Sequence, residues 1–481
     1  MSDSGFDYDA IIIGAGMSGL AAGIRLAMYD QRVCILERHT TIGGLNSFYR
    51  LDGRNYDVGL HALTNYVSKG DRRRPLGKVL KQLRFSWDEF QLRQQKGSQI
   101  AFGDVRLNFT NDIQRLTADV ADHFPRHVDQ LKQLIEELPE YEDLESIPDG
   151  ASGREFVARY IRDPMLAEML LAPLLYYGSA REQDIDLDQF VILFRSIYLE
   201  GFCRPREGVR LILRLLTRRY KQLGGELRLR CGVKALHTTG DSVEQVELDS
   251  GEVLRAKRIA SSAGWAETRE LLRDRQQHSN ALDEARSDGN VLPPLDDRSA
   301  GVLSFVETLS VLDRPIAELG HDATIIFFNN GEHFDWRRPV DLVDPRSGVI
   351  CCPENFEFEQ PTEMPMVRVT CLANFDRWQE LAREEYLTQK DHWYEQIITT
   401  IKPFVPDFER HVVAHDMFTP TTIKRFTGHL NGAVYGAPRK QRDGRTGLAN
   451  LFICGTDQGF VGIIGTLVSG VSIANQHLLV D

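Results

Sequence analysis

Hydrophobic residues near the start of the chain pass from a strand-like run into a helical pattern through a glycine-rich turn. The segment is AIIIGAGMSGLAAGIRL, residues 10–26. Its apolar spacing predicts a strand over residues 9–13 and a helix over residues 18–29, and RVCILE predicts a second strand over residues 32–37. A β-α-β unit of about 30 residues is the smallest half of a dinucleotide-binding fold. The opening of the chain therefore predicts a nucleotide-binding domain.

Strand and helix patterns continue to alternate after this unit. SFYRLDGRNYDVG predicts a hairpin that turns at Asp52-Gly53. The further expectations are an irregular basic stretch over 70–100, helices over 111–200 and 207–223, strands from 226 to 264, a helix and loop over 270–300, strands with one helix near 379–402 within 301–440, a strand over 451–454 and a helix over 461–479.

These patterns predict an α/β protein in which a Rossmann-type nucleotide-binding domain is interleaved with an α+β substrate domain that carries a helical insertion. The nucleotide-binding domain is assigned to residues 1–70, 201–268 and 441–481. The substrate domain is assigned to residues 71–200, which form the mostly helical insertion, and 269–440, which form its sheet.

Composition narrows the class of partner. The 481 residues carry a formal net charge of −12, which argues against nucleic acid as a partner. Seven cysteines without a C-x-x-C pair predict reduced thiols and neither a disulfide framework nor a metal site. The polar start of the chain does not resemble a signal peptide, and no run of about 18 apolar residues occurs. We expect a cytoplasmic protein, and a peripheral contact with the inner face of a membrane stays open, as does the oligomeric state.

The glycine turn matches the pattern G-x-G-x-x-G. Gly14 permits the tight turn, Gly16 lets the backbone approach a pyrophosphate, and Gly19 lets the helix pack against the sheet. Met17 and Ser18 complete the turn. The acidic residue expected at the end of the second strand, where it binds a ribose 2′-hydroxyl, is Glu37, followed by Arg38. Glu37 would repel a 2′-phosphate, so NADP is disfavoured at this site.

Two further segments favour FAD over NAD. Gly43 and Gly44, followed by Leu45, come just after the second strand. The tail NLFICGTDQGFVGIIGTLVSG has a strand that ends near Gly455, beside an acid and the glycine-rich start of a helix. In that tail, Asp457 is expected to accept a hydrogen bond from a ribityl chain, and the N–H groups near Val461 and Gly462 to face the flavin ring.

The combination resembles the FAD-dependent oxidoreductases related to monoamine oxidase, and within them the group of phytoene desaturases, carotenoid cis-trans isomerases and retinol saturases. The residues that carry this resemblance are 10–37, GGLNSFYRLDGRNYDVGLHAL at 43–63, TPTTIKRFTGHLNGAVYG at 419–436 and the tail at 451–471. The resemblance implies that the Val233 backbone contacts adenine and that Ser262, Ala263 and Gly264 close over the nucleotide. It also implies an apolar polyisoprenoid substrate and hydride transfer at flavin N5.

Two residues are candidates for the catalytic centre. His61, in DVGLHAL, is either an acid–base group beside the flavin or a histidine held by loop backbone or cofactor. Tyr435 resembles an aromatic residue that faces the flavin in this family, and core packing is its alternative. Likewise, MLLAPLLYYG at 169–178 is either a buried helix or the wall of a lipid tunnel. The direction of the reaction, whether desaturation, isomerisation or saturation, stays open.

Two rival functions remain. A flavin amine oxidase would need a cage of two aromatic residues, of which the sequence offers only Tyr435. A prenyl-binding protein similar to the Rab GDP dissociation inhibitors would bind no flavin. The intact set of Gly14, Gly16, Gly19 and Glu37 argues against the second rival.

Overall fold

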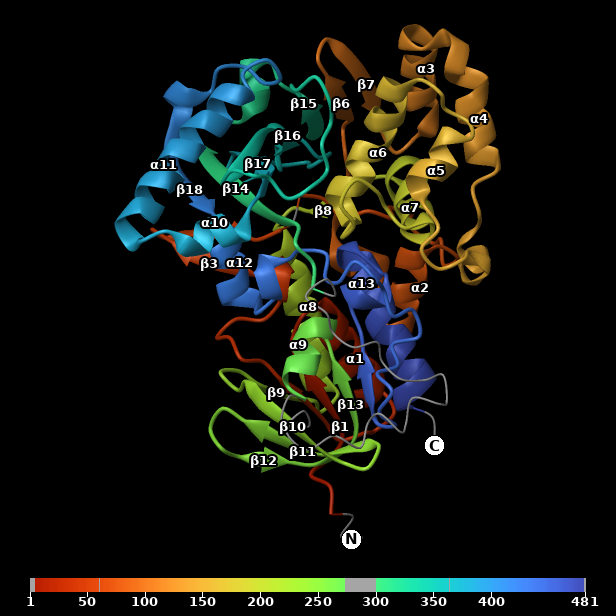
Figure 1. Cartoon of the computed structure of the whole chain (residues 1–481), viewed down its shortest axis with the longest axis vertical. Coiled ribbons are helices and arrows are strands. Elements are labelled where there is room, and N and C mark those ends of the chain that lie inside the picture. The colour runs from red at the N-terminus through yellow and green to blue at the C-terminus, as the bar shows by residue number, and fades with distance from the viewer. Residues whose placement is uncertain (1–4, 60, 273–299, 363, 480–481) are drawn as a thin grey trace.

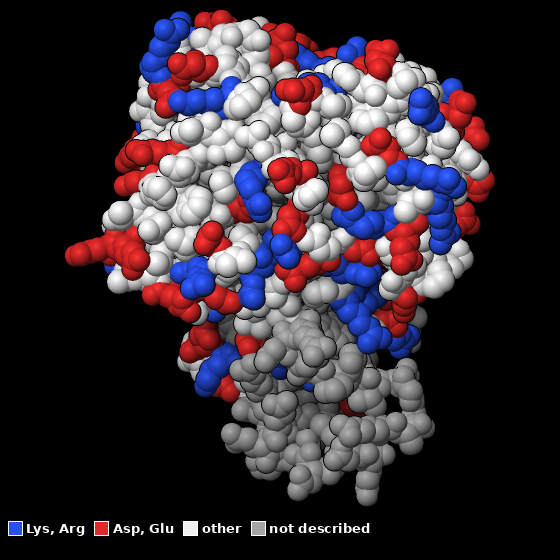
Figure 2. Space-filling view, turned by 45° about the horizontal axis from the view of Figure 1, so that its top comes forward, with Lys and Arg blue, Asp and Glu red and all other residues white. Residues whose placement is uncertain are grey.

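The computed structural model describes residues 5–59, 61–272, 300–362 and 364–479. Figure 1 shows two lobes, and the described residues both begin and end in the lower one. The expected helix and loop over 270–300 fall mostly on residues 273–299, outside the described residues. On the face in Figure 2, acidic and basic side chains are interspersed over the upper lobe.

The lower lobe is built on a parallel sheet of five strands. Along the central strands, alternate side chains face opposite layers, as the period of two requires. Ile11 and Ile13 pack toward a small antiparallel sheet, whereas Ala10 and Ile12 pack toward helices. In spatial order the strands are β19 (Leu451–Ile453), β13 (Ala256–Ser261), β1 (Tyr8–Ile13), β2 (Val33–Leu36) and β9 (Glu226–Arg228). The small sheet is β10 (Val233–Thr239), β11 (Ser242–Leu248) and β12 (Val253–Leu254).

Three helices cover the other face of this sheet. They are α1 (Met17–Ala27), α8 (Val209–Gln222) and α13 (Gly462–Ile473). The tail helix α13 lies so close to α1 that a Cβ on Gly470 would stand 2.1 Å from the Ser18 carbonyl oxygen. This contact fixes α13 beside α1. The Rossmann-type sheet expected from the sequence is confirmed.

The upper lobe contains a sheet of seven strands. Its order is β18 (Val412–Phe418), β14 (Ser304–Leu312), β17 (Met366–Ala373), β16 (Val343–Cys351), β15 (Ile325–Asn329), β6 (Ser98–Phe102) and β7 (Val105–Phe109). One face is covered by α10 (Phe375–Glu380) and α11 (Arg383–Thr400). The other face meets a helical layer of α3 (Ile113–His123), α4 (Val128–Glu136), α5 (Gly153–Ala158), α6 (Pro164–Gly178) and α7 (Leu187–Phe194), which runs on into a π-helical turn over Arg195–Glu200.

The expectation that residues 70–100 are irregular is wrong. They contain α2 (Pro75–Gln82) and β5 (Leu92–Gln94), and the sheet strand β6 begins within them. β5 pairs with β8 (Cys203–Pro205), and β6 pairs in parallel with β15, more than 200 residues later in the chain. Such short strands gain their hydrogen bonds from distant partners, which a local pattern does not reveal.

A hairpin and a helix lie where the two lobes meet. β3 (Phe48–Leu51) and β4 (Arg54–Asp57) form the hairpin predicted at Asp52-Gly53, and both turn residues have positive φ, as a type I′ turn requires. α12 (Pro420–Thr427) packs beside this hairpin. The domain boundaries assigned from the sequence stay predictions. Among the described residues, no helix has both the length and the apolar composition that crossing a bilayer requires.

Candidate active site

The glycine turn between β1 and α1 is packed so closely that side chains are excluded at two positions. Gly14 has a φ of 95°, and a Cβ on it would lie 2.7 Å from Ser262 Oγ. That hydroxyl lies 3.1 Å from the carbonyl oxygens of both Ile13 and Gly14. A Cβ on Gly19 would lie 2.1 Å from the Gly14 carbonyl oxygen. Gly14 and Gly19 therefore define the turn itself.

Gly16 and Gly44 instead border a hollow. A Cβ on Gly16 would find no atom closer than Ser262 Oγ at 3.9 Å, and one on Gly44 would find only the Gly16 Cα at 3.9 Å. The Gly43 N–H donates to the Ala15 carbonyl at 2.9 Å, which holds the two glycine segments together. No side chain caps the start of α1 at Gly16, where Met17 and Ser18 begin the helix. Backbone N–H groups at a helix N-terminus suit a phosphate.

A carboxylate and a guanidinium follow β2 at one side of this turn. Glu37 is 8% exposed, and its two oxygens accept the N–H groups of Ala15 at 2.9 Å and His39 at 2.8 Å. Each oxygen retains a lone pair for a further donor. A Cβ on Gly428 would touch the Arg38 guanidinium, and one on Gly232, just before Val233, would touch the Arg38 Cβ. Arg38 thus lies between the loop after α12 and the start of β10.

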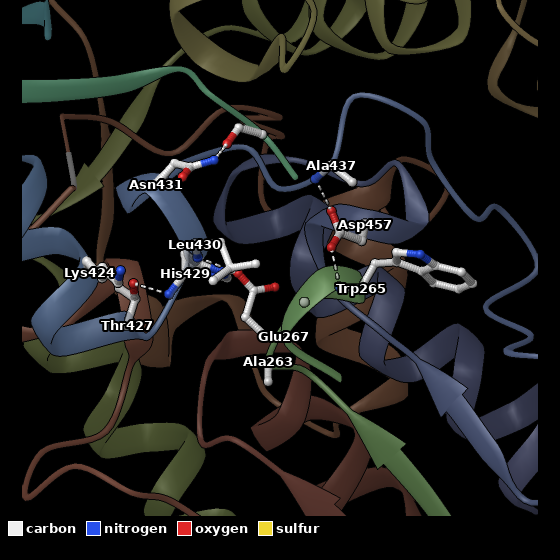
Figure 3. A network of polar contacts seen from close by, with 12 residues as sticks. Ala263, Trp265, Glu267, Lys424, Thr427, His429, Leu430, Asn431, Ala437 and Asp457 are labelled. Atoms are coloured by element: carbon white, nitrogen blue, oxygen red, sulfur yellow. Dashed lines mark hydrogen bonds and ion pairs between the residues drawn. The ribbon is translucent and has the colours of Figure 1, made fainter. Parts of the chain in front are cut away.

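A buried polar network closes the site from the other side (Figure 3). The Asp457 carboxylate accepts the N–H groups of Ala437 at 2.7 Å and Trp265 at 2.5 Å. Trp265 begins α9 (Trp265–Glu270), directly after Ser262, Ala263 and Gly264. Asp457 joins three segments that are distant in sequence, and its expected bond to a ribityl chain stays a prediction.

An ion pair continues this network. Glu267 accepts the Leu430 N–H at 2.7 Å, and its Oε1 lies 3.3 Å from His429 Nδ1. Burial disfavours the charged imidazole, but the Glu267 carboxylate outweighs burial and raises the pKa of His429. Burial likewise works to raise the pKa of Glu267, and the His429 imidazolium together with backbone N–H groups lowers it. The pair ties α9 to the loop after α12.

A cavity of about 140 Å³ lies between the lobes. Of the residues expected from the sequence, it brings together Leu45, His61, Tyr435 and Gly462. Gly455 and Val461 are buried beside it: a Cβ on Gly455 would approach Ser18 Oγ, and Val461 packs against Gly178 of α6. Further lining residues are Asn46, Val58, Gly59, Ala62, Thr64, Tyr176, Tyr177, Phe305, Glu307, Val349, Thr370, Phe418, Ile423, Val434, Thr456, Ile463 and Thr466.

Aromatic rings form much of the cavity wall. The Tyr435 hydroxyl donates to the Tyr176 carbonyl oxygen, and its ring meets Phe305 edge-to-face with centroids 5.9 Å apart. Tyr176 and Tyr177 lie in the last turn of α6, whose leucines lie in the core. The interpretation of MLLAPLLYYG as a buried helix is confirmed, and the last turn of the helix lines the cavity, whereas a lipid tunnel there stays a prediction.

His61 contacts a carboxylate that the sequence analysis missed. His61 Nε2 lies 3.2 Å from Glu307 Oε1 and 3.0 Å from Thr370 Oγ1. The same Glu307 oxygen accepts Arg368 Nε at 2.6 Å and lies 2.6 Å from Arg368 Nη2. A single charge within each apolar run, VLSFVETLSVL and MVRVTCLA, is the signal that could have identified this buried pair.

The charge states within this group follow from its contacts. Burial raises the pKa of a carboxyl, but Arg368 and His61 outweigh burial and hold the pKa of Glu307 at about 2. Burial lowers the pKa of His61, and Arg368 and Arg204 add to this effect against the opposing Glu307. Nearby, Arg204 Nη2 donates to Asp57 Oδ2 at 2.9 Å. Around neutral pH the group is therefore two ion pairs and one neutral imidazole.

Comparison with known proteins gives the family. The family model for flavin containing amine oxidoreductases matches residues 17–478. Prolycopene isomerase of Arabidopsis thaliana is 22% identical, over 98% of this chain and 82% of that protein. All-trans-retinol 13,14-reductase of Danio rerio is 22% identical, over 98% of this chain and 87% of that protein. A solved oxidoreductase from Methanosarcina mazei has a TM-score of 0.64 at 15% identity, over 97% of this chain and all of that one.

The chain belongs to the flavin-containing amine oxidoreductases, and it is an FAD-dependent oxidoreductase. The residues of the site fit FAD on their own geometry. Gly16 and Gly44 leave open space beside the helix N-terminus, which suits the approach of a pyrophosphate, and Glu37 keeps acceptor capacity for a ribose. At the far end, Gly462 begins α13 at the cavity. The prediction of FAD is confirmed, and the contacts of the individual residues with it stay predictions.

Proposed function

We propose that this oxidoreductase acts on an apolar polyene of the polyisoprenoid class by hydride transfer between a substrate carbon and the flavin. The observation that carries the proposal is the cavity, whose lining is mainly aliphatic and aromatic. Its lining includes the neutral imidazole of His61 and a carboxylate, Glu307, that Arg368 already neutralises. Such a wall suits a hydrocarbon chain and provides no unpaired charge for an ionic substrate. Relatives named for carotenoids and retinol support the same class.

In this proposal one end of the site binds the nucleotide and the other end faces the flavin ring. Gly14, Gly16, Gly19 and Glu37 belong to the set that holds the nucleotide, and Gly462 begins the segment that faces the ring. The other residues that we propose to contact the cofactor are Met17, Ser18, Arg38, Gly43, Gly44, Leu45, Val233, Ser262, Ala263, Gly264, Gly455, Asp457 and Val461. The flavin supplies a two-electron site that exchanges a hydride with carbon.

The cavity residues position the substrate and handle its proton. Tyr435 and its aromatic neighbours exclude water and align the chain of the substrate. His61 accepts or returns a proton, because it lines the cavity and has an ionisable ring. Neither Tyr435 nor His61 acts as a nucleophile in this proposal.

Amine oxidation is the second candidate, and one observation favours it. The second aromatic residue that the sequence analysis lacked is available, since Phe305, Tyr176 and Tyr177 line the same cavity as Tyr435. The paired state of Glu307 argues against it, because an ammonium group would find no free carboxylate there. The prenyl-binding alternative without flavin is set aside by the family assignment.

The test is anaerobic reduction of the bound flavin. The purified holoenzyme is mixed separately with phytoene, a cis-carotene, retinol and putrescine, and the oxidised flavin bands are recorded. Bleaching by phytoene alone supports a polyene desaturase. Isomerisation of the cis-carotene only after chemical reduction indicates an isomerase, whereas saturation of retinol by the reduced enzyme indicates a reductase. Bleaching by putrescine with none of the polyenes would replace the proposal with amine oxidation.

We also propose a cytoplasmic protein that contacts a membrane surface at its periphery. The support is chemical, because an apolar polyisoprenoid partitions into a bilayer and has to be taken from it. The seven cysteines are free thiols, as a reducing compartment favours. Sedimentation of the protein with liposomes, with and without phytoene, tests the contact.

A further inference from the structure

The His61 ring is anchored through one of its two nitrogens. Both polar contacts, with Glu307 Oε1 and Thr370 Oγ1, are made by Nε2. Nδ1 has no hydrogen-bond partner among the described residues. Turning the ring over would replace Nε2 by a carbon and remove both contacts, so the orientation is well determined by its surroundings. The anchored and the free nitrogen therefore have different roles.

The carboxylate decides which nitrogen carries the proton. With its pKa held at about 2, Glu307 is ionised and can only accept hydrogen bonds. A lone pair on Nε2 would face this carboxylate oxygen at 3.2 Å and be repelled. Nε2 must therefore carry the hydrogen, and in a neutral imidazole Nδ1 is then an unprotonated acceptor.

The surrounding charges keep the imidazole neutral. The groups that face it are Glu307 on β14, Arg368 and Thr370 on β17, Arg204 on β8 and the Cys351 thiol on β16, whose Sγ lies 3.8 Å from the His61 carbonyl oxygen. Arg368, which is 1% exposed, and Arg204 both place a positive charge near the ring. A protonated His61 would be a third positive charge in the same group, so the charged imidazole is disfavoured.

We infer that Glu307 is a positioning residue that fixes His61 as a base, with Nδ1 set to accept a proton from a substrate carbon. The inference rests on the proposed function and adds a direction to it. In such a step, one C–H bond of the substrate would yield its proton to Nδ1, and the adjacent carbon would yield a hydride to the oxidised flavin that the site holds when loaded. Two C–H bonds break and one C=C bond forms, so atoms and electrons balance. The resting site is thus prepared for desaturation rather than for protonation of a double bond.

Histidine-selective ¹⁵N labelling of the holoenzyme tests the tautomer directly, and the spectrum of His61→Gln identifies the signal. The expected result for the wild type at pH 7.5 is a neutral ring with hydrogen on Nε2 (pH chosen at about one unit above the ordinary pKa of histidine). In Glu307→Gln the amide can donate as well as accept, so a mixture of tautomers is expected. Thr370→Val, which keeps the carboxylate, is the matched control and keeps the wild-type tautomer. A wild-type ring that is cationic, or protonated on Nδ1, overturns the inference.

Glu307→Gln leaves Arg368 without its carboxylate and can impair folding. Glu307→Gln/Arg368→Met therefore repeats the measurement in a site without the buried ion pair, and it is expected to lose the preference for Nε2 as well. A double variant that keeps the wild-type tautomer contradicts the role of Glu307.

The kinetic arm measures the rate of flavin bleaching by phytoene against pH. In the wild type the rate falls as pH drops through the pKa of His61, which lies below its ordinary value. His61→Gln is expected to slow bleaching at least 100-fold, and Glu307→Gln about tenfold with the acidic limb moved to lower pH, because the carboxylate raises the pKa of His61. If phytoene and other polyenes never bleach the flavin while the tautomer is as expected, the proposed function fails and the assignment of Glu307 as the positioning residue stands.

Discussion

Alanine at Gly16 and alanine at Gly19 perturb the glycine turn in opposite ways. A Cβ on Gly19 would lie 2.1 Å from the Gly14 carbonyl oxygen, so backbone has to move. Overpacking of this kind costs about 1–3 kcal/mol, and the cost is already present in the apoprotein. Gly16 has φ −70° and ψ 177°, which alanine adopts readily, and its Cβ meets nothing closer than 3.9 Å.

Gly16→Ala is therefore expected to leave the apoprotein unchanged or to stabilise it by about 0.4–1 kcal/mol through the unfolded state. Its methyl group enters the hollow next to Gly44, where the pyrophosphate is expected. We predict at least a tenfold loss of FAD affinity, or about 1.4 kcal/mol. Gly19→Ala is predicted to lower both the stability and the affinity.

Two measurements separate the effects. Urea unfolding of the apoproteins gives the stability, and the rise of flavin fluorescence on release gives the affinity. Gly97→Ala, a glycine in the upper lobe whose Cβ would make only ordinary contacts, is the control and should leave both unchanged. Wild-type FAD affinity in Gly16→Ala would mean that the hollow is not the phosphate site. Wild-type stability of Gly19→Ala apoprotein would mean that the turn is not packed as described.

Three further predictions concern buried polar groups. Asp57→Asn removes the carboxylate beside buried Arg204 and should destabilise the protein by about 3–5 kcal/mol in urea unfolding; a loss below about 1 kcal/mol would contradict the pairing. Burial raises the pKa of Glu200 from 4.5 to about 7. Within that window the folded state holds a proton on Glu200 that the unfolded state has lost, so the free energy of unfolding falls as pH rises. Glu200→Gln should remove that loss, on the order of 3 kcal/mol by pH 8, and an unchanged pH profile of unfolding would refute it. A thiol reagent should modify at most the half-buried Cys231 in the native protein and seven thiols after unfolding, and rapid reaction of several native thiols would oppose the burial described.

The sequence was sufficient wherever the determinant is local. The turn at Asp52-Gly53 needs only two residues that accept positive φ, and the hairpin forms there. The glycine turn is likewise encoded within residues 14–19. Such features depend on backbone conformation and short-range spacing, which a single sequence displays directly.

The charged part of the candidate site could not be predicted in the same way. Glu307 and Arg368 are 61 residues apart, and Thr370 is 309 residues from His61. Only the pairing of β14 with β17 brings the first two together, and only the meeting of the lobes brings them to His61. A lone charge in an apolar strand predicts that a partner exists, but it does not identify that partner.

The energetics of the buried pair argue for a role beyond stability. An arginine–carboxylate pair enclosed in a hydrophobic wall gives up the hydration of two ions, and well-packed apolar residues in its place are often neutral or stabilising. Glu307 and Arg368 are both almost completely buried, so the penalty applies in full. An apolar pair in place of Glu307 and Arg368 would, however, leave His61 Nε2 without its carboxylate. The neutral imidazole could then carry its hydrogen on either nitrogen. The ion pair thus accounts for a property that packing alone does not supply, a histidine with a defined acceptor in an otherwise apolar cavity.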